Sequence, residues 1–215
     1  MKEENIIPLP KRITVCIIGN ILVSLGIALA KIAALGSDPF NGMCLSVSAF
    51  FNWEYWIFNW ICNLIFFACE FIWGRKYINV GTVLNWFMVG YIADFFMKLY
   101  SWVFPEAKAL YVRIPLLIFG IIALAFGIAL YQQADWGIAP YDALPIIAHD
   151  YFPKIPYFWC RMIEDGLCVV GMALTITPKA KFLGAGTVVF AFCMGPVIHL
   201  FTKLLTRKKA SPDVE

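Results

Sequence analysis

Six long apolar runs, each able to cross a lipid bilayer, constrain the fold of this chain more than any other feature. A transmembrane helix needs about 20 mainly apolar residues. The runs cover approximately residues 13–34, 55–73, 80–104, 114–134, 156–176 and 183–205. Many of their edges carry tryptophan or tyrosine, as is typical of membrane–water interfaces. The pattern predicts an all-α polytopic membrane protein with the lipid bilayer as its surroundings.

The charge content favours the same class. Of the 215 residues, 14% are charged and 61% are hydrophobic, whereas soluble domains carry about 25% charged residues. The formal net charge of +3 is too small to predict nucleic-acid binding. All seven cysteines lie in apolar segments and none forms a CxxC pair, so we expect them to pack as small apolar residues. The sequence therefore predicts no metal site and no cofactor.

Two further apolar segments, residues 39–52 and 140–152, are too short to cross a membrane as helices. A helix of about 13 residues extends for about 20 Å, which is less than the hydrocarbon core. Each segment opens with proline after a glycine-containing turn, as a new helix does. We interpret both as half-helices, meaning short helices that enter the membrane without crossing it.

An internal repeat relates the two halves of the chain. Glycines and a proline recur at a shift of 101 positions: Gly19, Gly26, Gly36 and Pro39 correspond to Gly120, Gly127, Gly137 and Pro140. The repeat predicts two homologous membrane units, residues 13–104 and 114–205, joined by a linker at 105–113. We expect residues 1–12 to form a cytoplasmic N-terminal segment and residues 206–215 a cytoplasmic tail.

The topology of the two repeats depends on the half-helices. If they do not cross, each repeat has three long transmembrane helices and the two copies are inverted, which gives six spans. If they cross, each repeat has four spans and the copies are parallel. With the N-terminus in the cytoplasm, both arrangements place both termini there, and the basic residues in the loops do not decide between them. The shortness of the half-helices favours six spans.

Short glycine- and proline-based motifs give the chain a family resemblance. They are residues 35–41 (LGSDPFN), residues 81–85 (GTVLN) with Gly90 and Asp94, residues 137–142 (GIAPYD), and Gly186-Thr187 with Gly195-Pro196. With these motifs the chain resembles the YczE/YyaS/YitT group of bacterial membrane proteins over about residues 13–205. The resemblance implies a location in the bacterial inner membrane and a layout similar to that of small transporters.

The fifth apolar run carries three charged residues on one face: Arg161, Glu164 and Asp165. A charged residue at the centre of a membrane helix costs at least about 2.5–3.5 kcal/mol and usually faces an interior cavity. The repeat-related positions carry Asn59 and Asn63. We therefore expect these side chains to form a central polar site. The alternative is that Arg161 reaches the interface as an anchor.

The starts of the half-helices, with Asp38, Asn41 and Asp142, are the second candidate site. Free N–H groups and the positive end of the helix dipole bind anionic groups of solutes in inverted-repeat transporters. Alternatively, the two aspartates cap their own helices. The predicted substrate-binding residues are Asp38, Asn41, Asn59, Asn63, Asp142, Arg161, Glu164 and Asp165.

Motifs of common enzymes are missing from the sequence, which has neither HExxH nor GxSxG and only two histidines. We therefore predict no catalytic residues and no enzyme. The favoured function is a small secondary transporter or permease for a small polar or zwitterionic solute bound between the repeats. The alternatives are a membrane ligand-binding or accessory subunit and, less favoured, an intramembrane enzyme. Expected partners are the solute and either a second copy of the chain or an energising protein.

Overall fold

The structure is a computed structural model that describes residues 8–104, 109–175 and 183–210. Within these ranges the chain is helical and contains no β-strand, which confirms the predicted all-α class. The long helices are α1 (Leu9–Ala33), α3 (Tyr55–Trp73), α4 (Val80–Val103), α5 (Leu110–Gln133), α7 (Tyr157–Leu174) and α8 (Ala185–Ala210). The short ones are α2 (Pro39–Phe51), α6 (Pro140–Tyr151) and the 3₁₀ turn η1 (Arg75–Tyr77).

The helix boundaries agree with the expected ones to within about five residues. The short helices α2 and α6 have 13 and 12 residues, as their segments predicted. The main differences are that α1 begins at Leu9 rather than 13 and α8 continues to Ala210 rather than 205. Helix α5 begins at Leu110 rather than 114, so residues 110–113 of the expected linker are helical. Proline is tolerated in the first turn of a helix, so Pro10 does not delay the start of α1. Parts of the expected terminal segments (1–7 and 211–215) and of the expected linker (105–108) lie outside the described residues. The same holds for residues 176–182, which begin at the last residue of the fifth run.

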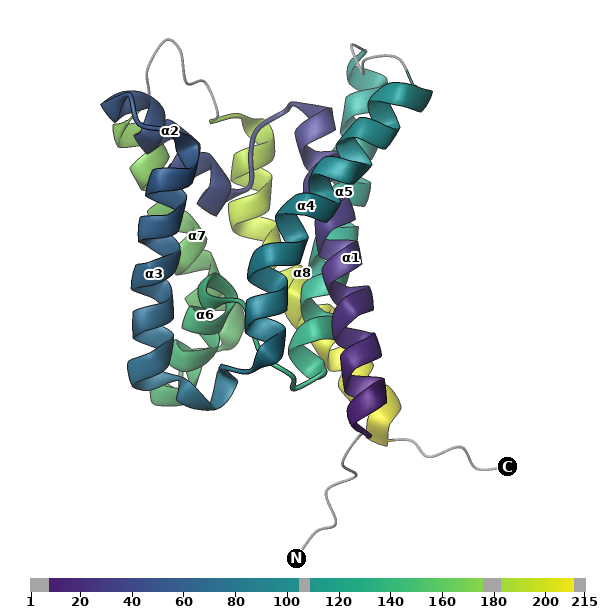
Figure 1. The fold of residues 1–215 in the computed structure, drawn as a ribbon, viewed down its shortest axis with the longest axis vertical. Helices are drawn as coiled ribbons and strands as arrows, with labels where there is room; N and C mark the ends of the chain where they lie inside the picture. The colour runs from purple at the N-terminus through teal and green to yellow at the C-terminus, as the bar shows by residue number, and fades with distance from the viewer. Residues whose placement is uncertain (1–7, 105–108, 176–182, 211–215) are drawn as a thin grey trace, which may run out of the picture.

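Helix length and composition identify a multi-pass membrane protein. Four of the described helices, α1, α4, α5 and α8, are long and apolar enough to cross a bilayer. The helices α3 and α7 have 19 and 18 residues and so approach the required length. Figure 1 shows that α1 begins and α8 ends at the same end of the molecule, whereas α2 lies near the opposite end.

Helices α1 and α5 cross in close contact at glycines. A Cβ atom on Gly19 would lie 2.9 Å from the carbonyl oxygen of Gly127, and one on Gly26 would lie 2.7 Å from that of Gly120. Small residues at such positions let membrane helices approach closely. Because Gly19 meets the later glycine of α5 and Gly26 the earlier one, the two helices run antiparallel.

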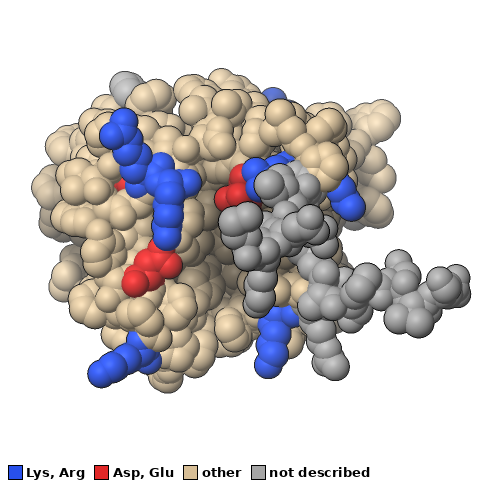
Figure 2. Space-filling model, turned by 90° about the horizontal axis from the view of Figure 1, so that it is seen from below, with Lys and Arg blue, Asp and Glu red and all other residues tan. Residues whose placement is uncertain are grey.

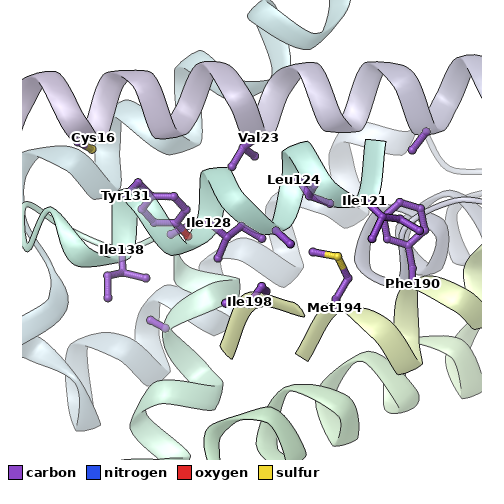
Figure 3. Packing of buried hydrophobic residues seen from close by; sticks show 14 of the residues in the cluster. Cys16, Val23, Ile121, Leu124, Ile128, Tyr131, Ile138, Phe190, Met194 and Ile198 are labelled. Carbon is purple, nitrogen blue, oxygen red and sulfur yellow. The ribbon is translucent and has the colours of Figure 1, made fainter. Parts of the chain in front are cut away.

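The main hydrophobic core lies beside this crossing. Figure 3 shows Val23 of α1 and Leu124 and Ile128 of α5 on one side, with Met194 and Ile198 of α8 facing them. All five side chains are buried. The three helices therefore form a packed scaffold against which the other helices are placed.

The start of α2 is fixed to the first turn of α8. The Gly186 N–H donates to the carbonyl oxygen of Leu35 at 2.9 Å, and the Ser37 N–H donates to Oγ1 of Thr187 at 3.1 Å. Gly36 has φ of +142°, and its Cβ would lie 2.6 Å from the backbone nitrogen of Thr187. Glycine is therefore needed at this turn for both its backbone conformation and its small size.

The start of α6 is fixed to the first turn of α4 in the same way. The Gly81 N–H donates to the carbonyl oxygen of Trp136 at 2.8 Å, and the Ile138 N–H donates to that of Tyr77 at 3.0 Å. Gly137 has φ of +114° and would meet the backbone of Thr82 if it carried a Cβ atom. In both places backbone polar groups that no helix satisfies are paired across distant parts of the chain, as a membrane interior requires.

The far end of α6 is tied to η1 by a surface cluster. Asp150 accepts from Nζ of Lys76 and from the hydroxyl of Tyr77, each at 2.6 Å. Partial burial alone would raise the pKa of Asp150, but these two hydrogen bonds outweigh it, so the pKa lies below its usual value. Both ends of α6 are thus attached to the connection between α3 and α4.

The glycine crossing yields a stability prediction. Gly26→Ala places a methyl group 2.6 Å from the backbone nitrogen of Leu124, and such overpacking costs about 1–3 kcal/mol. A Cβ atom on Gly166 of α7 meets nothing within 4 Å, so Gly166→Ala is the matched control, with a gain of up to about 1 kcal/mol from helix propensity. Thermal unfolding of the detergent-purified variants should show a lower midpoint for Gly26→Ala only. Equal midpoints would contradict the close crossing.

Candidate functional site

A central cavity of about 360 Å³ is lined by residues from all eight α-helices of the described chain. Its apolar wall includes Leu124 and Ile128 of α5 and Phe190 and Met194 of α8. Its polar and charged residues are Lys31, Asp38, Asn41, Asn59, Asn63, Asn85, Asp94, Asp142, Arg161 and Asp165. A concave space with an apolar wall and a few convergent polar groups is the usual form of a small-molecule site.

Arg161 of α7 is the centre of a buried ionic network. Its Nη1 contacts Oδ1 of Asp142 in α6, and its Nε lies 3.3 Å from Oδ2 of Asp165 one turn further along α7. The guanidinium also lies over the ring of Tyr141, 4.6 Å from the ring centroid. The side chain of Arg161 is 6% exposed. The alternative in which Arg161 reaches the interface as an anchor is therefore wrong.

Two tyrosines complete the network. The hydroxyl of Tyr131 donates to Oδ2 of Asp142, and the hydroxyl of Tyr141 donates to Oδ1 of Asp165 at 2.5 Å. Each carboxylate therefore has both oxygens engaged, one by the guanidinium and one by a phenol. A buried polar network with every member satisfied is rigid, so this wall of the cavity is preformed.

The starts of the two half-helices meet at the cavity. The rings of Phe40 in α2 and Tyr141 in α6 stack with centroids 4.7 Å apart and planes 21° apart. Asp38 caps α2, because its Oδ1 accepts from the Asn41 N–H at 3.1 Å. Asp142 does not cap α6; it lies in the first turn of that helix and binds Arg161 instead. The capping alternative is therefore right for Asp38 and wrong for Asp142.

Asparagines supply the remaining predicted positions. Asn59 and Asn63 of α3 line the cavity, and Nδ2 of Asn63 donates to the carbonyl oxygen of Asn59 at 2.9 Å. From α4, Nδ2 of Asn85 donates to Oδ1 of Asn20 in α1 at 2.7 Å. The cavity thus carries amide groups from both α3 and α4.

Glu164 lies away from the other predicted residues. It lines a second, apolar cavity of about 420 Å³ with residues such as Phe66 of α3 and Pro145 of α6. Successive residues of a helix turn by 100°, so Glu164 and Asp165 point to different neighbours although both lie within a turn of Arg161. Both carboxylate oxygens of Glu164 are buried and have no hydrogen-bond partner in the part of the chain that the structure describes. The predicted common site therefore brings together seven of its eight residues, without Glu164.

No cluster of three or more histidine, cysteine, aspartate or glutamate residues arranged to hold a metal ion occurs among the described residues. What the described residues do bring together is an ionic wall, amide groups and aromatic rings around one cavity.

Comparison with known proteins gives the family. Residues 10–203 match the model of a family described as a family of unknown function, DUF6198. The chain belongs to this family.

The DUF6198 chain is also similar to bacterial proteins over most of its length. It is 26% identical to YyaS of Bacillus subtilis, with 88% of this chain and 92% of YyaS covered. It is 24% identical to YczE of the same organism, described as an uncharacterized membrane protein, with both chains fully covered. A third relative, from Haemophilus influenzae, is 24% identical over 92% of this chain and 86% of its own. The resemblance to YczE and YyaS is confirmed. No solved structure matches the chain.

Several residues of the DUF6198 site were not predicted from the sequence. Tyr131, Tyr141, Asn20 and Asp94 were not predicted as site residues, although Tyr141 and Asp94 belong to the family motifs. For Tyr141 a signal existed: it stands between Pro140 and Asp142, and an aromatic residue, Phe40, also follows the first proline. For Tyr131 and Asn20 no local pattern exists, because their partners lie on other helices.

The ionic network yields a second stability prediction. Arg161→Ala strands two buried carboxylates, and breaking a buried ion pair costs about 3–5 kcal/mol. Arg12→Ala is the matched control, because it removes an ion pair with Asp135, whose side chain is 76% exposed, and such pairs contribute about 0–1 kcal/mol. Unfolding in mixed micelles should separate the two variants clearly. Similar small losses for both would show that the Arg161 network does not hold the fold together.

Proposed function

We propose that the chain is a small secondary transporter or permease of the bacterial inner membrane that binds a small polar or zwitterionic solute in the central cavity. The observation that carries this proposal is that the starts of both half-helices, at Pro39 and Pro140, line the same cavity as the polar residues of α3 and α7. In transporters built from inverted repeats, broken helices meet in this way around the solute.

We further infer that the two halves, residues 13–104 and 114–205, are inverted repeats. Reciprocal contacts support this. The pair Gly19–Gly127 becomes Gly120–Gly26 when the halves are exchanged, and both pairs are in contact. The stacked rings of Phe40 and Tyr141 occupy equivalent positions in the two halves. Equivalent contacts between exchanged halves are expected from a two-fold axis in the membrane plane.

The two halves differ in one respect that suits alternating access. A Cβ atom on Gly195 of α8 would lie 2.6 Å from the carbonyl oxygen of Phe158 in α7, so α8 packs tightly on α7. The equivalent Gly90 of α4 meets nothing within 4 Å and lines the cavity. Here α4 reaches α3 through the ring of Trp86, whose centroid lies 5.5 Å from that of Trp60. In transporters of this type, the two repeats move against each other around a fixed solute site. A loosely packed repeat and a tightly packed repeat that exchange their arrangements would open this site first to one side of the membrane and then to the other.

The distribution of basic residues supports an orientation with both termini in the cytoplasm. Figure 2 shows the end of the molecule that carries the termini, with several Lys and Arg side chains and fewer Asp and Glu. Lys11 and Arg12 at the start of α1 and Arg75 and Lys76 after α3 belong to connections at this end. An excess of Lys and Arg marks the cytoplasmic side. With six spans, the half-helices enter the membrane from opposite sides.

Transport is tested with the purified chain in proteoliposomes. The assay measures counterflow of a panel of radiolabelled amino acids, amines and amino alcohols. At least one compound should exchange, and Asp165→Asn should abolish its exchange, because this residue lines the cavity and holds Arg161. Asp135→Asn, which alters an exposed carboxylate, should exchange normally. Binding without exchange would identify a ligand-binding subunit instead of a transporter.

Topology is tested at the two ends of α3. With six spans and a cytoplasmic N-terminus, Glu54→Cys should react with a membrane-impermeant maleimide added outside intact cells, and Arg75→Cys should be shielded. Both residues are exposed, whereas the native cysteines are buried or half-buried. With eight spans the half-helix crosses, so the labelling of the two sites would be reversed.

A further inference from the structure

We propose that the solute of the central cavity is an organic cation, with an ammonium group attached to a body small enough for the cavity. The proposal rests on the proposed function in that it takes this cavity as the solute site. It narrows the solute from polar or zwitterionic molecules to amines, and it excludes organic anions.

The charges around the cavity are unequal. Four carboxylates line it against two basic side chains: Asp38, Asp94, Asp142 and Asp165 against Lys31 and Arg161. Lys31, in the last turn of α1, is exposed, and so is Asp94 of α4. The remaining groups are three carboxylates against Arg161. Inside a site of low dielectric constant, an unbalanced negative charge attracts cations and repels anions more strongly than it does in water.

The charge of Arg161 is already opposed by two carboxylates of the protein. Its Nη1 and Nε contact Asp142 and Asp165, and its guanidinium lies over the ring of Tyr141. A solute carboxylate that took the place of either aspartate would leave a buried carboxylate without its cation, which is strongly unfavourable.

The starts of the half-helices are also unsuited to an anion. At α2 the positive end of the helix dipole is occupied by Asp38, which accepts from the Asn41 N–H. At α6 the carboxylate of Asp142 lies in the first turn. Both helices begin with proline, Pro39 and Pro140, which has no N–H to donate. At α2 the anion-binding role expected of a helix start is thus filled by the protein's own carboxylate, and at α6 a solute anion would meet the negative charge of Asp142.

Two of the four carboxylates remain for an ammonium group. The hydrogen bonds of Asp38 come from Asn41, a neutral residue. Asp94 of α4 lines the cavity and has no hydrogen-bond or ion-pair partner in the described ranges of the chain. These two aspartates come from different helices, which places negative charge on more than one wall of the cavity.

Aromatic rings favour an organic cation over a hydrated metal ion. Phe40 and Trp86 line the cavity, whereas the ring of Tyr141 is already stacked on Phe40 and covered by the guanidinium of Arg161. An organic cation is attracted to the face of an aromatic ring within about 6 Å of its centroid. The amide groups of Asn63 and Asn85 add polar contacts near these rings. The combination of carboxylates, amides and rings is the chemistry that recognises amines and quaternary ammonium groups.

The test compares ligands that share one ring system and differ in charge. Full-length protein in nanodiscs at pH 7 is titrated with tryptamine, a cation, tryptophol, which is neutral, and indole-3-acetate, an anion. We expect tryptamine to bind at least tenfold more tightly than either of the others, as a charge-assisted hydrogen bond contributes about that factor. Tighter binding of indole-3-acetate, or equal binding of all three, would overturn the proposal.

Variants then assign the preference to the named carboxylates. Asp38→Asn and Asp94→Asn should each weaken tryptamine binding by about tenfold and leave tryptophol binding unchanged. Asp135→Asn, outside the cavity, should change neither. If both cavity variants bind tryptamine like the parent, the charge preference arises elsewhere and the proposal fails.

A second pair covers aliphatic solutes. If no indole compound binds, choline is compared with its neutral isostere 3,3-dimethylbutan-1-ol in the same assay, and the absence of choline binding would overturn the proposal as well. Failure of the transporter function has a different signature. Cation binding without counterflow in proteoliposomes would support the organic-cation proposal and contradict the transporter proposal. Counterflow of an organic anion would support the transporter proposal and contradict the organic-cation proposal.

Discussion

The guanidinium of Arg161 is the charge around which the interior of the protein is arranged. A cation buried in a membrane helix is tolerated only with partners close by. One partner, Asp165, comes from the same helix, and two more, Asp142 and Tyr141, come from the first turn of α6. The charge on α7 therefore adds an ionic tie to a short helix that also packs in the core through Ala143 and Ile147. Because Tyr141 in turn stacks on Phe40, the start of α2 is placed by the same contact.

Backbone hydrogen bonds provide a second constraint of equal importance. A chain that stops and restarts a helix inside the membrane leaves N–H and C=O groups that lipid does not satisfy. Here the carbonyl oxygens of Leu35 and Trp136, in the turns before α2 and α6, accept hydrogen bonds from the N–H groups of Gly186 and Gly81. Each turn is thus completed by a helix from the other half of the chain. Neither half can form its half-helix correctly alone, which ties the formation of the cavity to the assembly of the whole protein.

These constraints explain which features were predictable from the sequence. Apolar length and the positions of glycine and proline are local features, so the long helices and both short helices were predicted to within about five residues. That Arg161 and Asp165 share one face of a helix was also predicted, because their spacing along the chain is sufficient, and the structure pairs them. The pairs Arg161–Asp142 and Asn20–Asn85 join different helices, so no local pattern indicates them. Glu164 was grouped with Arg161 and Asp165 because all three lie within about one turn of the same helix. Their spacing in the sequence does not show which neighbouring helix each side chain contacts, and Glu164 lines a different cavity.

The difference between the two halves of the molecule can be traced to one position of the proposed repeat. The shift of 105 residues that relates Gly81 to Gly186 and Gly90 to Gly195 also relates Trp86 of α4 to Ala191 of α8. The ring of Trp86 fills the space between α4 and α3, where it meets Trp60, and so keeps the two backbones apart. Ala191 is buried and small, so α8 approaches α7 until Gly195 touches its backbone. The glycines that permit close packing are the same in both halves, but only one half has the small neighbour that allows it. The side of the cavity that is loosely packed is therefore encoded in the sequence, and it is the side lined by an aromatic ring suited to an organic cation.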